Sequence, residues 1–408
     1  DPEQSVLATP RLHHFNYECS GALISDSSPD QKVQILTGLR QKGLYQGTHT
    51  TGGGVQSSFT IDYSPWRGDF WETLQGGEVV SSVQTQPQNG VTETLLPTGV
   101  TLRSVEAPDL RFAGAPRKLS SRVTFPDGRQ ITNQYDEDLV LDNPNDPFSV
   151  KSYRWTVDQY SGPEQRHSSV GFSRDQQNVL VSESAEGRHS ERYVDAQGRV
   201  LVEQLPKVLP ISYGYDNHGQ LKEIRQGTRI LSTELNAQGQ IERTLVNGKV
   251  VETIRQYNGL GQPKVAEYPD GGQLVMTYNR NGAVTQMTTP GGAVHQWSLS
   301  PGDQADVYTA PDVGIPLAER QTQYTYTQDR NLRLTRSPSN TSALHYDARG
   351  RIDGIDAAST SPSYEAQRFT TLHYQTGTGL LESIENTKGP ALAFTYTYGL
   401  PESVTWSG

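Results

Sequence analysis

The phrase Tyr215-Asp216-Asn217-His218-Gly219-Gln220 recurs along the chain at a nearly constant spacing. Each copy has an aspartate or asparagine followed three residues later by glycine, and most copies place a tyrosine directly before that residue. The aspartate or asparagine stands at positions 195, 216, 236, 258 and 279, so the period is about 21 residues. A further copy, Tyr346-Asp347-Ala348-Arg349-Gly350, follows later in the chain. A fixed period of this length indicates a repeat architecture.

Each copy predicts a tight turn. The side chain of aspartate or asparagine accepts a hydrogen bond from the backbone two residues on, and glycine adopts the positive φ that such turns need. A second turn signal, such as Asn247-Gly248 or Asp270-Gly271-Gly272, lies in the middle of the repeat. Two turns in about 21 residues leave two strands of about six residues each, which is near the usual strand length. The fold class predicted is therefore all-β, with stacked antiparallel hairpins.

The tyrosines before the turns recur at equivalent positions of stacked hairpins. We therefore expect Tyr215, Tyr257 and Tyr278 to lie in register on one face of one sheet. Tyrosine suits such a face because its ring packs while its hydroxyl stays hydrated or finds a partner. The positions to which we assign a structural role are Asp195, Gly198, Tyr215, Asp216, Gly219, Asn236, Gly239, Tyr257, Asn258, Gly261, Tyr278, Asn279, Gly282, Tyr346, Asp347 and Gly350.

The composition agrees with a chain of many turns. Hydrophobic residues make up only 33% of the 408 residues, but 20 Tyr, 9 Phe and 5 Trp give the chain much to bury. This composition argues against a coiled coil, collagen or a transmembrane bundle. The net charge of −10 and the lack of a basic run argue against nucleic-acid binding. No stretch of 18 apolar residues is present for membrane insertion.

The repeat is clearest in one part of the chain. We expect residues 1–120 to be a β-rich N-terminal region of degenerate repeats or an entry module. Residues 121–300 form the repeat sheet, 301–323 an insertion or loop, and 324–408 further repeats of the same kind. Because the first residues, Asp1-Pro2-Glu3-Gln4, include no initiator methionine, we expect a processed or excised piece of a longer polypeptide.

The Tyr-Asp phrase, with glycine three residues after the aspartate and a period near 21, resembles the YD-repeat or rearrangement-hot-spot (RHS) family. The resemblance is strong over 193–300 and weaker over 121–192 and 324–408. It implies a β-sheet strip that curls or forms part of a hollow shell. In bacterial polymorphic toxins and insecticidal toxin complexes of this family, the shell encloses a toxic C-terminal domain.

Two further segments predict loops. The acidic stretch from Asp136 to Pro147 predicts a solvated loop, since its spacing lacks the glycine of a calcium-binding loop. The glycine-rich stretch Gly47–Gly54 predicts a hairpin tip. Cys19 is the only cysteine, so no intrachain disulfide can form, and we expect its thiol to be buried as a small apolar group.

No catalytic motif is present, such as a Gly-x-Ser-x-Gly or a phosphate-binding loop with its lysine. We therefore expect no enzyme activity, catalytic residue, cofactor or metal site. Tyr63, Trp66 and Trp71 are the weak candidates for a ligand platform, since aromatic rings can bind sugar faces. They flank the turn sequence Arg67-Gly68-Asp69, so core packing around that turn is the stronger interpretation.

The resemblance favours one function over a second. The first is a structural shell segment that encapsulates a toxin or effector domain for secretion or delivery. The alternative is an extracellular carbohydrate- or protein-binding adhesion module built on the same repeats. The partners expected are the remainder of a larger parent polypeptide or a partner shell chain, together with the encapsulated toxin domain. The location expected is secreted or extracellular, as part of an exported bacterial protein.

Overall fold

The computed structural model describes residues 12–62, 70–75, 78–86, 90–174, 178–359 and 367–407. The chain divides into two compact units. Unit 1 comprises residues 1–84, 94–99 and 276–408, and unit 2 comprises residues 85–93 and 100–275. Strands β7 (Glu78–Gln86), β8 (Val91–Leu95) and β23 (Gln273–Tyr278) contain residues of both units.

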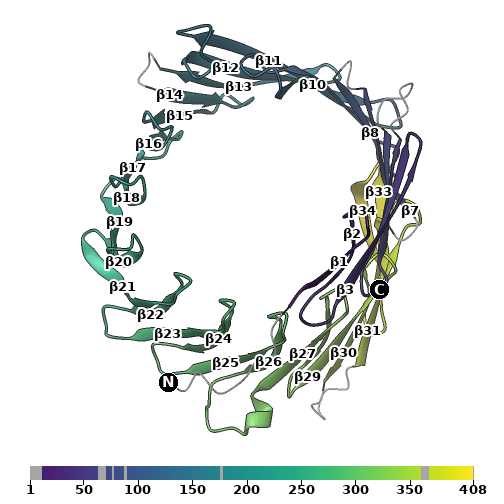
Figure 1. Cartoon of the computed structure of the whole chain (residues 1–408), viewed down its shortest axis with the longest axis vertical. Helices are drawn as coiled ribbons and strands as arrows, with labels where there is room; N and C mark the ends of the chain where they lie inside the picture. The colour runs from purple at the N-terminus through teal and green to yellow at the C-terminus, as the bar shows by residue number, and fades with distance from the viewer. Residues whose placement is uncertain are drawn as a thin grey trace. The chain divides into compact units, whose positions relative to one another are not determined.

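Unit 2 is a run of strands that follow one another in space as they do in sequence (Figure 1). Its strands are β9 (Thr101–Pro108), β10 (Pro116–Thr124), β11 (Gln130–Leu141), β12 (Val150–Ser161), β13 (Glu164–Ser173), β14 (Val179–Glu183), β15 (His189–Val194), β16 (Val200–Gln204), β17 (Ile211–Tyr215), β18 (Leu221–Gln226), β19 (Arg229–Leu235), β20 (Ile241–Val246), β21 (Lys249–Tyr257) and β22 (Pro263–Glu267).

Unit 1 contains two runs of strands, one from each end of the chain. The N-terminal run is β1 (His14–Tyr17), β2 (Leu23–Ser27), β3 (Val33–Gln41), β4 (Leu44–Thr50), β5 (Gln56–Asp62), β6 (Phe70–Gln75) and β7 (Glu78–Gln86). The C-terminal run is β24 (Val284–Thr288), β25 (Val294–Leu299), β26 (Ala305–Thr309), β27 (Gln321–Tyr326), β28 (Leu332–Arg336), β29 (Asn340–Tyr346), β30 (Ile352–Ser359), β31 (Gln367–Tyr374), β32 (Leu381–Asn386), β33 (Ala391–Thr397) and β34 (Leu400–Ser407).

The strand pairing confirms the predicted all-β strip of stacked antiparallel hairpins. Among the described residues, the pairings within each unit are antiparallel and join strands that are consecutive in the chain, as in β17 with β18 and β18 with β19. The single helical element of the described ranges is the short 3₁₀ turn Leu317–Glu319. Consecutive pairing follows from the sequence, because each tight turn returns the chain beside the strand it has just left.

The sheet has very little buried core. Among the described residues, the only buried apolar side chains are Val100, Val179 and Ala266. Many large apolar side chains remain exposed, including Leu209, Leu260 and Trp406. A sheet normally buries one face against a second layer, so hydrogen bonds and turn contacts carry more of the stability here than in a packed two-layer domain.

Three of the predictions for single segments are wrong, two of them in part and one entirely. Residues 136–141 belong to β11 and pair with β12, where Glu137 lies opposite Trp155, so the predicted acidic loop is confined to the turn after Leu141. Residues 47–50 belong to β4, and only the turn from Thr51 to Val55 is a hairpin tip. Cys19 is exposed, because it lies in the turn between β1 and β2, where no second layer covers it.

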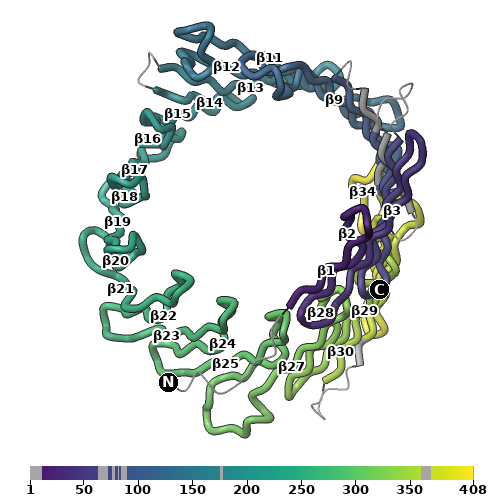
Figure 2. The backbone as a smooth tube through the Cα atoms, in the orientation of Figure 1, coloured from purple at the N-terminus to yellow at the C-terminus, as the bar shows by residue number. Residues whose placement is uncertain are grey.

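Within unit 1, the turns of the N-terminal hairpins meet the turns of the C-terminal repeats (Figure 2). The amide of Gly53 donates to Asp329 Oδ1 at 2.7 Å, and Gln75 Nε2 donates to the carbonyl of Arg349 at 3.1 Å. Residues more than 270 positions apart in sequence are thus hydrogen-bonded. The predicted boundaries at 120, 300 and 323 remain predictions.

Candidate functional site

The repeat turns share one hydrogen-bonding pattern. In the turn at Asp216, the Oδ1 atom accepts the backbone N–H of His218 at 2.9 Å and that of Gln220 at 2.8 Å. The N–H of Gly219 donates to the Asp216 carbonyl at 3.1 Å. The Oδ1 atom accepts from the same two backbone positions in the turns at Asp195, Asn236, Asn258, Asn279 and Asp347.

The fourth residue of each of these turns has a positive φ. Its value is 78° at Gly198 and 85° at Gly219. The equivalent glycines Gly239, Gly261, Gly282 and Gly350 have φ between 76° and 84°. Residues with a Cβ atom are strained in this region by about 1–2 kcal/mol, which explains why glycine recurs at this position.

The repeat tyrosines connect each turn to the one before it. The hydroxyl of Tyr215, at the end of β17, donates to the carbonyl of Val200 at the start of β16, at 2.9 Å. Tyr257 makes the equivalent bond to the Ile241 carbonyl. Tyr326, Tyr346 and Tyr374 do the same with Ala305, Leu332 and Ile352, at 2.7–2.9 Å. We call this set of hydroxyl–carbonyl bonds the tyrosine ladder. Tyr278 stands at the same position in β23, and its hydroxyl lies 3.5 Å from Met276 Sδ.

Arginines strengthen the tyrosine ladder at two repeats. Arg199 Nε donates to Asp195 Oδ2 at 2.7 Å, and its guanidinium carbon lies 4.8 Å from the centre of the Tyr215 ring. Arg351 makes the same pair of contacts with Asp347, at 2.7 Å, and with Tyr374, at 4.0 Å. The turns at Asn236 and Asn258 use an amide pair instead, with Gln240 at 3.1 Å and Gln262 at 2.9 Å. Both arrangements tie the first residue of a turn to its fifth.

The position of Arg199 predicts different costs for two equivalent glycine substitutions. A Cβ atom on Gly219 would lie 2.8 Å from Arg199 Nη1, whereas one on Gly198 would meet nothing within 4 Å. Gly198→Ala should cost only the backbone strain, about 1–2 kcal/mol. Gly219→Ala should cost about 0.5–1 kcal/mol more, because Arg199 must leave the Tyr215 ring. Urea unfolding followed by circular dichroism measures both losses. Equal losses would show that Arg199 adds nothing at Tyr215.

Three further turns have the same backbone form without its usual residues. In the turns Ser28–Lys32, Ser300–Gln304 and Thr327–Asn331, serine or threonine replaces the first residue. Gln31, Asp303 and Arg330 occupy the fourth position, with φ of 61°, 61° and 66°. Sequence reasoning missed these copies because it searched for Asp or Asn followed by Gly. The signal that could have found them is spacing, since 279, 300, 327 and 347 continue the period, with six extra residues between 300 and 327.

These atypical turns meet in unit 1, around Asp30. Its side chain is only 8% exposed and lies 3.2 Å from Lys32 Nζ and 3.2 Å from Arg330 Nη2. Lys32 Nζ donates to Gln304 Oε1 at 2.6 Å, and Gln304 Nε2 donates to the Arg330 carbonyl at 3.0 Å. We call Asp30, Lys32, Gln304 and Arg330 the seam. It joins the β2–β3 turn to two turns of the C-terminal run.

The seam holds Asp30 in its charged form. Burial raises the pKa of the Asp30 carboxyl, but hydrogen bonds from Ser28 and Lys32 and the charge of Arg330 lower it more, from 3.8 to about 2. Arg330 has a positive φ, which is strained for a residue with a side chain. A glycine at this position would relieve the strain but would leave Asp30 without its ion pair to Arg330.

The structure leaves the predicted ligand platform largely untested. Tyr63 and Trp66 lie outside the described residues, and so does the Arg67-Gly68-Asp69 turn. Trp71 belongs to β6, but its side chain is not described. Within the described ranges, no group of three or more His, Cys, Asp or Glu is placed to hold a metal ion. No helix of those ranges is both long and apolar enough to cross a bilayer.

A single-layer strip built from repeated Asp/Asn–Gly turns and a tyrosine ladder defines the class of YD-repeat shell proteins. A family model, the Teneurin YD-shell, matches residues 72–406, and the chain belongs to this family. It is therefore a structural shell-type protein. No curated protein sequence matches it.

Solved structures show the same fold. A crystal structure titled TcdB2-TccC3 without hypervariable C-terminal region matches 96% of this chain with 12% identity and a TM-score of 0.55. The crystal structure titled TcdB2-TccC3-Cdc42 matches 95% of it with 13% identity and a TM-score of 0.51. The present chain covers only 24% and 25% of those chains, so it spans about a quarter of their length.

Proposed function

We propose that this chain is a stretch of shell wall that encloses a toxin or effector domain for secretion and delivery. The observation that carries this proposal is the single-layer sheet, in which apolar side chains of the strands, such as Leu39 of β3 (52% exposed) and Val140 of β11 (49% exposed), have no second layer over them. Exposed apolar surface of this extent indicates a surface that contacts other protein. A shell wall would have such a surface, because one of its faces contacts the cargo and its edges contact the neighbouring parts of the wall.

The proposed partners are the remainder of a parent polypeptide or a partner shell chain, and the enclosed domain. The lengths of the similar solved structures support a longer parent polypeptide or a partner shell chain, since the chains in those structures are about four times as long as this one. Edge strands need a neighbour because an unpaired edge promotes aggregation. The proposed location is outside the producing cell, as part of an exported bacterial protein.

The role proposed for the chain is mechanical rather than catalytic. The residues that recur along the chain form turns. Asp30, the carboxylate whose pKa is shifted most strongly, belongs to an ion pair of the seam. We likewise assign the repeated Asp, Asn, Gly and Tyr residues to the support of the wall. The alternative, an adhesion module, would use the same strip to present a binding surface.

Limited proteolysis of the parent polypeptide tests encapsulation. The domain that follows the repeats should resist protease while the wall is intact, and it should become cleavable after mild urea loosens the strip. The same domain expressed alone is the control and should be cut at once. If the attached domain is cut as fast as the isolated one, the chain does not enclose it, and the adhesion module becomes the better proposal.

A further inference from the structure

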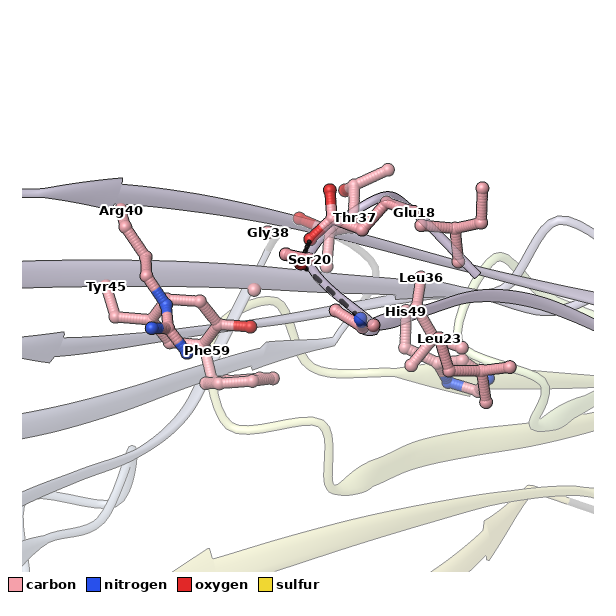
Figure 3. Close-up of a pocket in the computed structure, with 15 residues that line it drawn as sticks. Glu18, Ser20, Leu23, Leu36, Thr37, Gly38, Arg40, Tyr45, His49 and Phe59 are labelled. Atoms are coloured by element: carbon pink, nitrogen blue, oxygen red, sulfur yellow. Dashed lines mark hydrogen bonds between the residues drawn. The ribbon is translucent and has the colours of Figure 1, made fainter. Parts of the chain in front are cut away.

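A cleft of about 610 Å³ lies on one face of strands β2 to β5 in unit 1 (Figure 3). All of its lining residues fall between 18 and 59, before the segment that matches the shell family. The turn between β1 and β2 contributes Glu18, Ser20, Gly21 and Ala22, and strands β2 to β5 contribute the rest of the lining. The family match therefore does not account for this cleft.

Two glycines shape the floor of the cleft. Gly38 of β3 lies directly opposite Gly47 of β4, and Gly47 lies opposite Phe59 of β5. A Cβ atom on Gly38 would lie 2.9 Å from the Tyr45 hydroxyl oxygen, and one on Gly47 would overlap the Phe59 ring. Each ring therefore lies across the bare backbone of the neighbouring strand. Glycine inside a strand weakens it and often marks a place where a ligand approaches closely.

The two rings form an aromatic surface next to a cation. The ring centres of Tyr45 and Phe59 are 5.7 Å apart, and Phe59 remains 38% exposed. The Arg40 guanidinium lies 5.6 Å from the Tyr45 ring centre, and Figure 3 shows Arg40, Tyr45 and Phe59 grouped at one end of the cleft. An exposed ring supported by backbone on its other side can stack against a flat apolar surface of a ligand.

Polar groups border the rest of the cleft. Ser20 Oγ donates to Glu18 Oε1 at 2.5 Å, and Figure 3 shows Ser20 beside Gly38. His49 lies at the other end, with Nε2 3.3 Å from Gln34 Oε1. The border thus offers a carboxylate, a guanidinium, an imidazole and a hydroxyl, which can donate to and accept from hydroxyl groups in several directions.

The cleft does not suit the two commonest alternatives. An extended peptide would have to add to a free strand edge, but β3, β4 and β5 are each paired on both sides. A compact anion would be attracted by Arg40 but repelled by Glu18. A pyranose ring fits better, because it presents C–H groups from its faces and hydroxyl groups from its rim.

We propose that the cleft between Glu18, Arg40, Tyr45 and Phe59 binds a neutral, gluco-configured oligosaccharide. The C–H face of one sugar ring stacks on Phe59, and its rim hydroxyls bond to Arg40 and Glu18. The remaining volume, toward His49, accepts a second sugar ring. This activity is independent of encapsulation, so a shell wall that fails to enclose cargo would leave it unaffected.

Saturation-transfer NMR and calorimetry on the full chain, with cellotetraose and chitotetraose as probes, test the proposal. The chain should bind at least one of them. Phe59→Ala and Phe59→Leu should each weaken binding by about two- to tenfold, since an aromatic stacking contact is worth about 0.5–1.5 kcal/mol and about 1.4 kcal/mol is tenfold. Phe59→Leu retains an apolar side chain, so it distinguishes the loss of ring stacking from unfolding of strand β5.

Phe369→Ala provides the matched control, because Phe369 is an exposed phenylalanine (46%) on β31, far along the sequence from the cleft. It should bind as the unmodified chain does. Arg40→Gln should also weaken binding while the strands stay folded, as judged by circular dichroism. Absence of binding to both sugars, or unchanged binding by Phe59→Leu, would overturn the proposal.

Discussion

Replacing Tyr374 with alanine is expected to lower the free energy of unfolding of the C-terminal repeats by about 3 kcal/mol. The substitution removes a hydroxyl that donates to the Ile352 carbonyl at 2.7 Å and a ring that lies 4.0 Å from the Arg351 guanidinium carbon. Arg351 would then keep only Asp347 and the Gly379 carbonyl as partners. Because the strip has so little core, the loss of one ring removes a large part of the local packing.

Two control variants divide this effect into its parts. Tyr374→Phe keeps the ring and should cost only about 1 kcal/mol, the usual worth of one hydrogen bond. Tyr17→Ala removes a tyrosine that is 60% exposed on β1 and should change stability by less than about 0.5 kcal/mol. Urea unfolding followed by tyrosine fluorescence measures all three. If Tyr374→Ala and Tyr17→Ala cost the same, the tyrosine ladder does not stabilise the strip.

The periodic part of the fold could be predicted from the sequence because its signals are local. An aspartate, two variable residues and a glycine determine a turn by themselves, as the turn at Asp216 shows. The position of the tyrosine before each turn follows from the same period. The bond from Tyr215 to the Val200 carbonyl needs only two adjacent strands whose turns are in register. Repetition turned these weak signals into a clear one.

The segments that were mispredicted depend on neighbours that the sequence does not reveal. The acidic residues of β11 stay in a strand because β12 pairs with them, and Glu137 accepts a hydrogen bond from Tyr153 at 3.3 Å. Cys19 is exposed because the sheet has a single layer, which composition alone does not reveal. The seam joins Asp30 to Arg330, residues 300 positions apart, and no period links them.

Substituting the seam carboxylate is expected to weaken the contact between the N-terminal hairpins and the C-terminal repeats. Asp30→Asn removes the charge that faces Lys32 and Arg330, at 3.2 Å from each, and leaves two cations close together. A fall in pKa from 3.8 to about 2 corresponds to about 2 kcal/mol of stability that the charged form of Asp30 supplies. Hydrogen–deuterium exchange should therefore increase in β2, in β3 and in the turn Ser300–Gln304.

The effect of this substitution should depend on pH in a defined direction. The pKa of Asp30 is lower in the folded chain, so its contribution is complete above pH 3.8 and is lost as the pH falls toward about 2. The difference in stability between the unmodified chain and Asp30→Asn should therefore be constant near neutral pH and shrink across that acid range. The control is Asp127→Asn, which alters an exposed turn aspartate paired with Arg129 and should leave exchange in β2 and β3 unchanged. A difference that persists undiminished at pH 2, or equal exchange in the two variants, would show that the Asp30 charge does not hold the seam together.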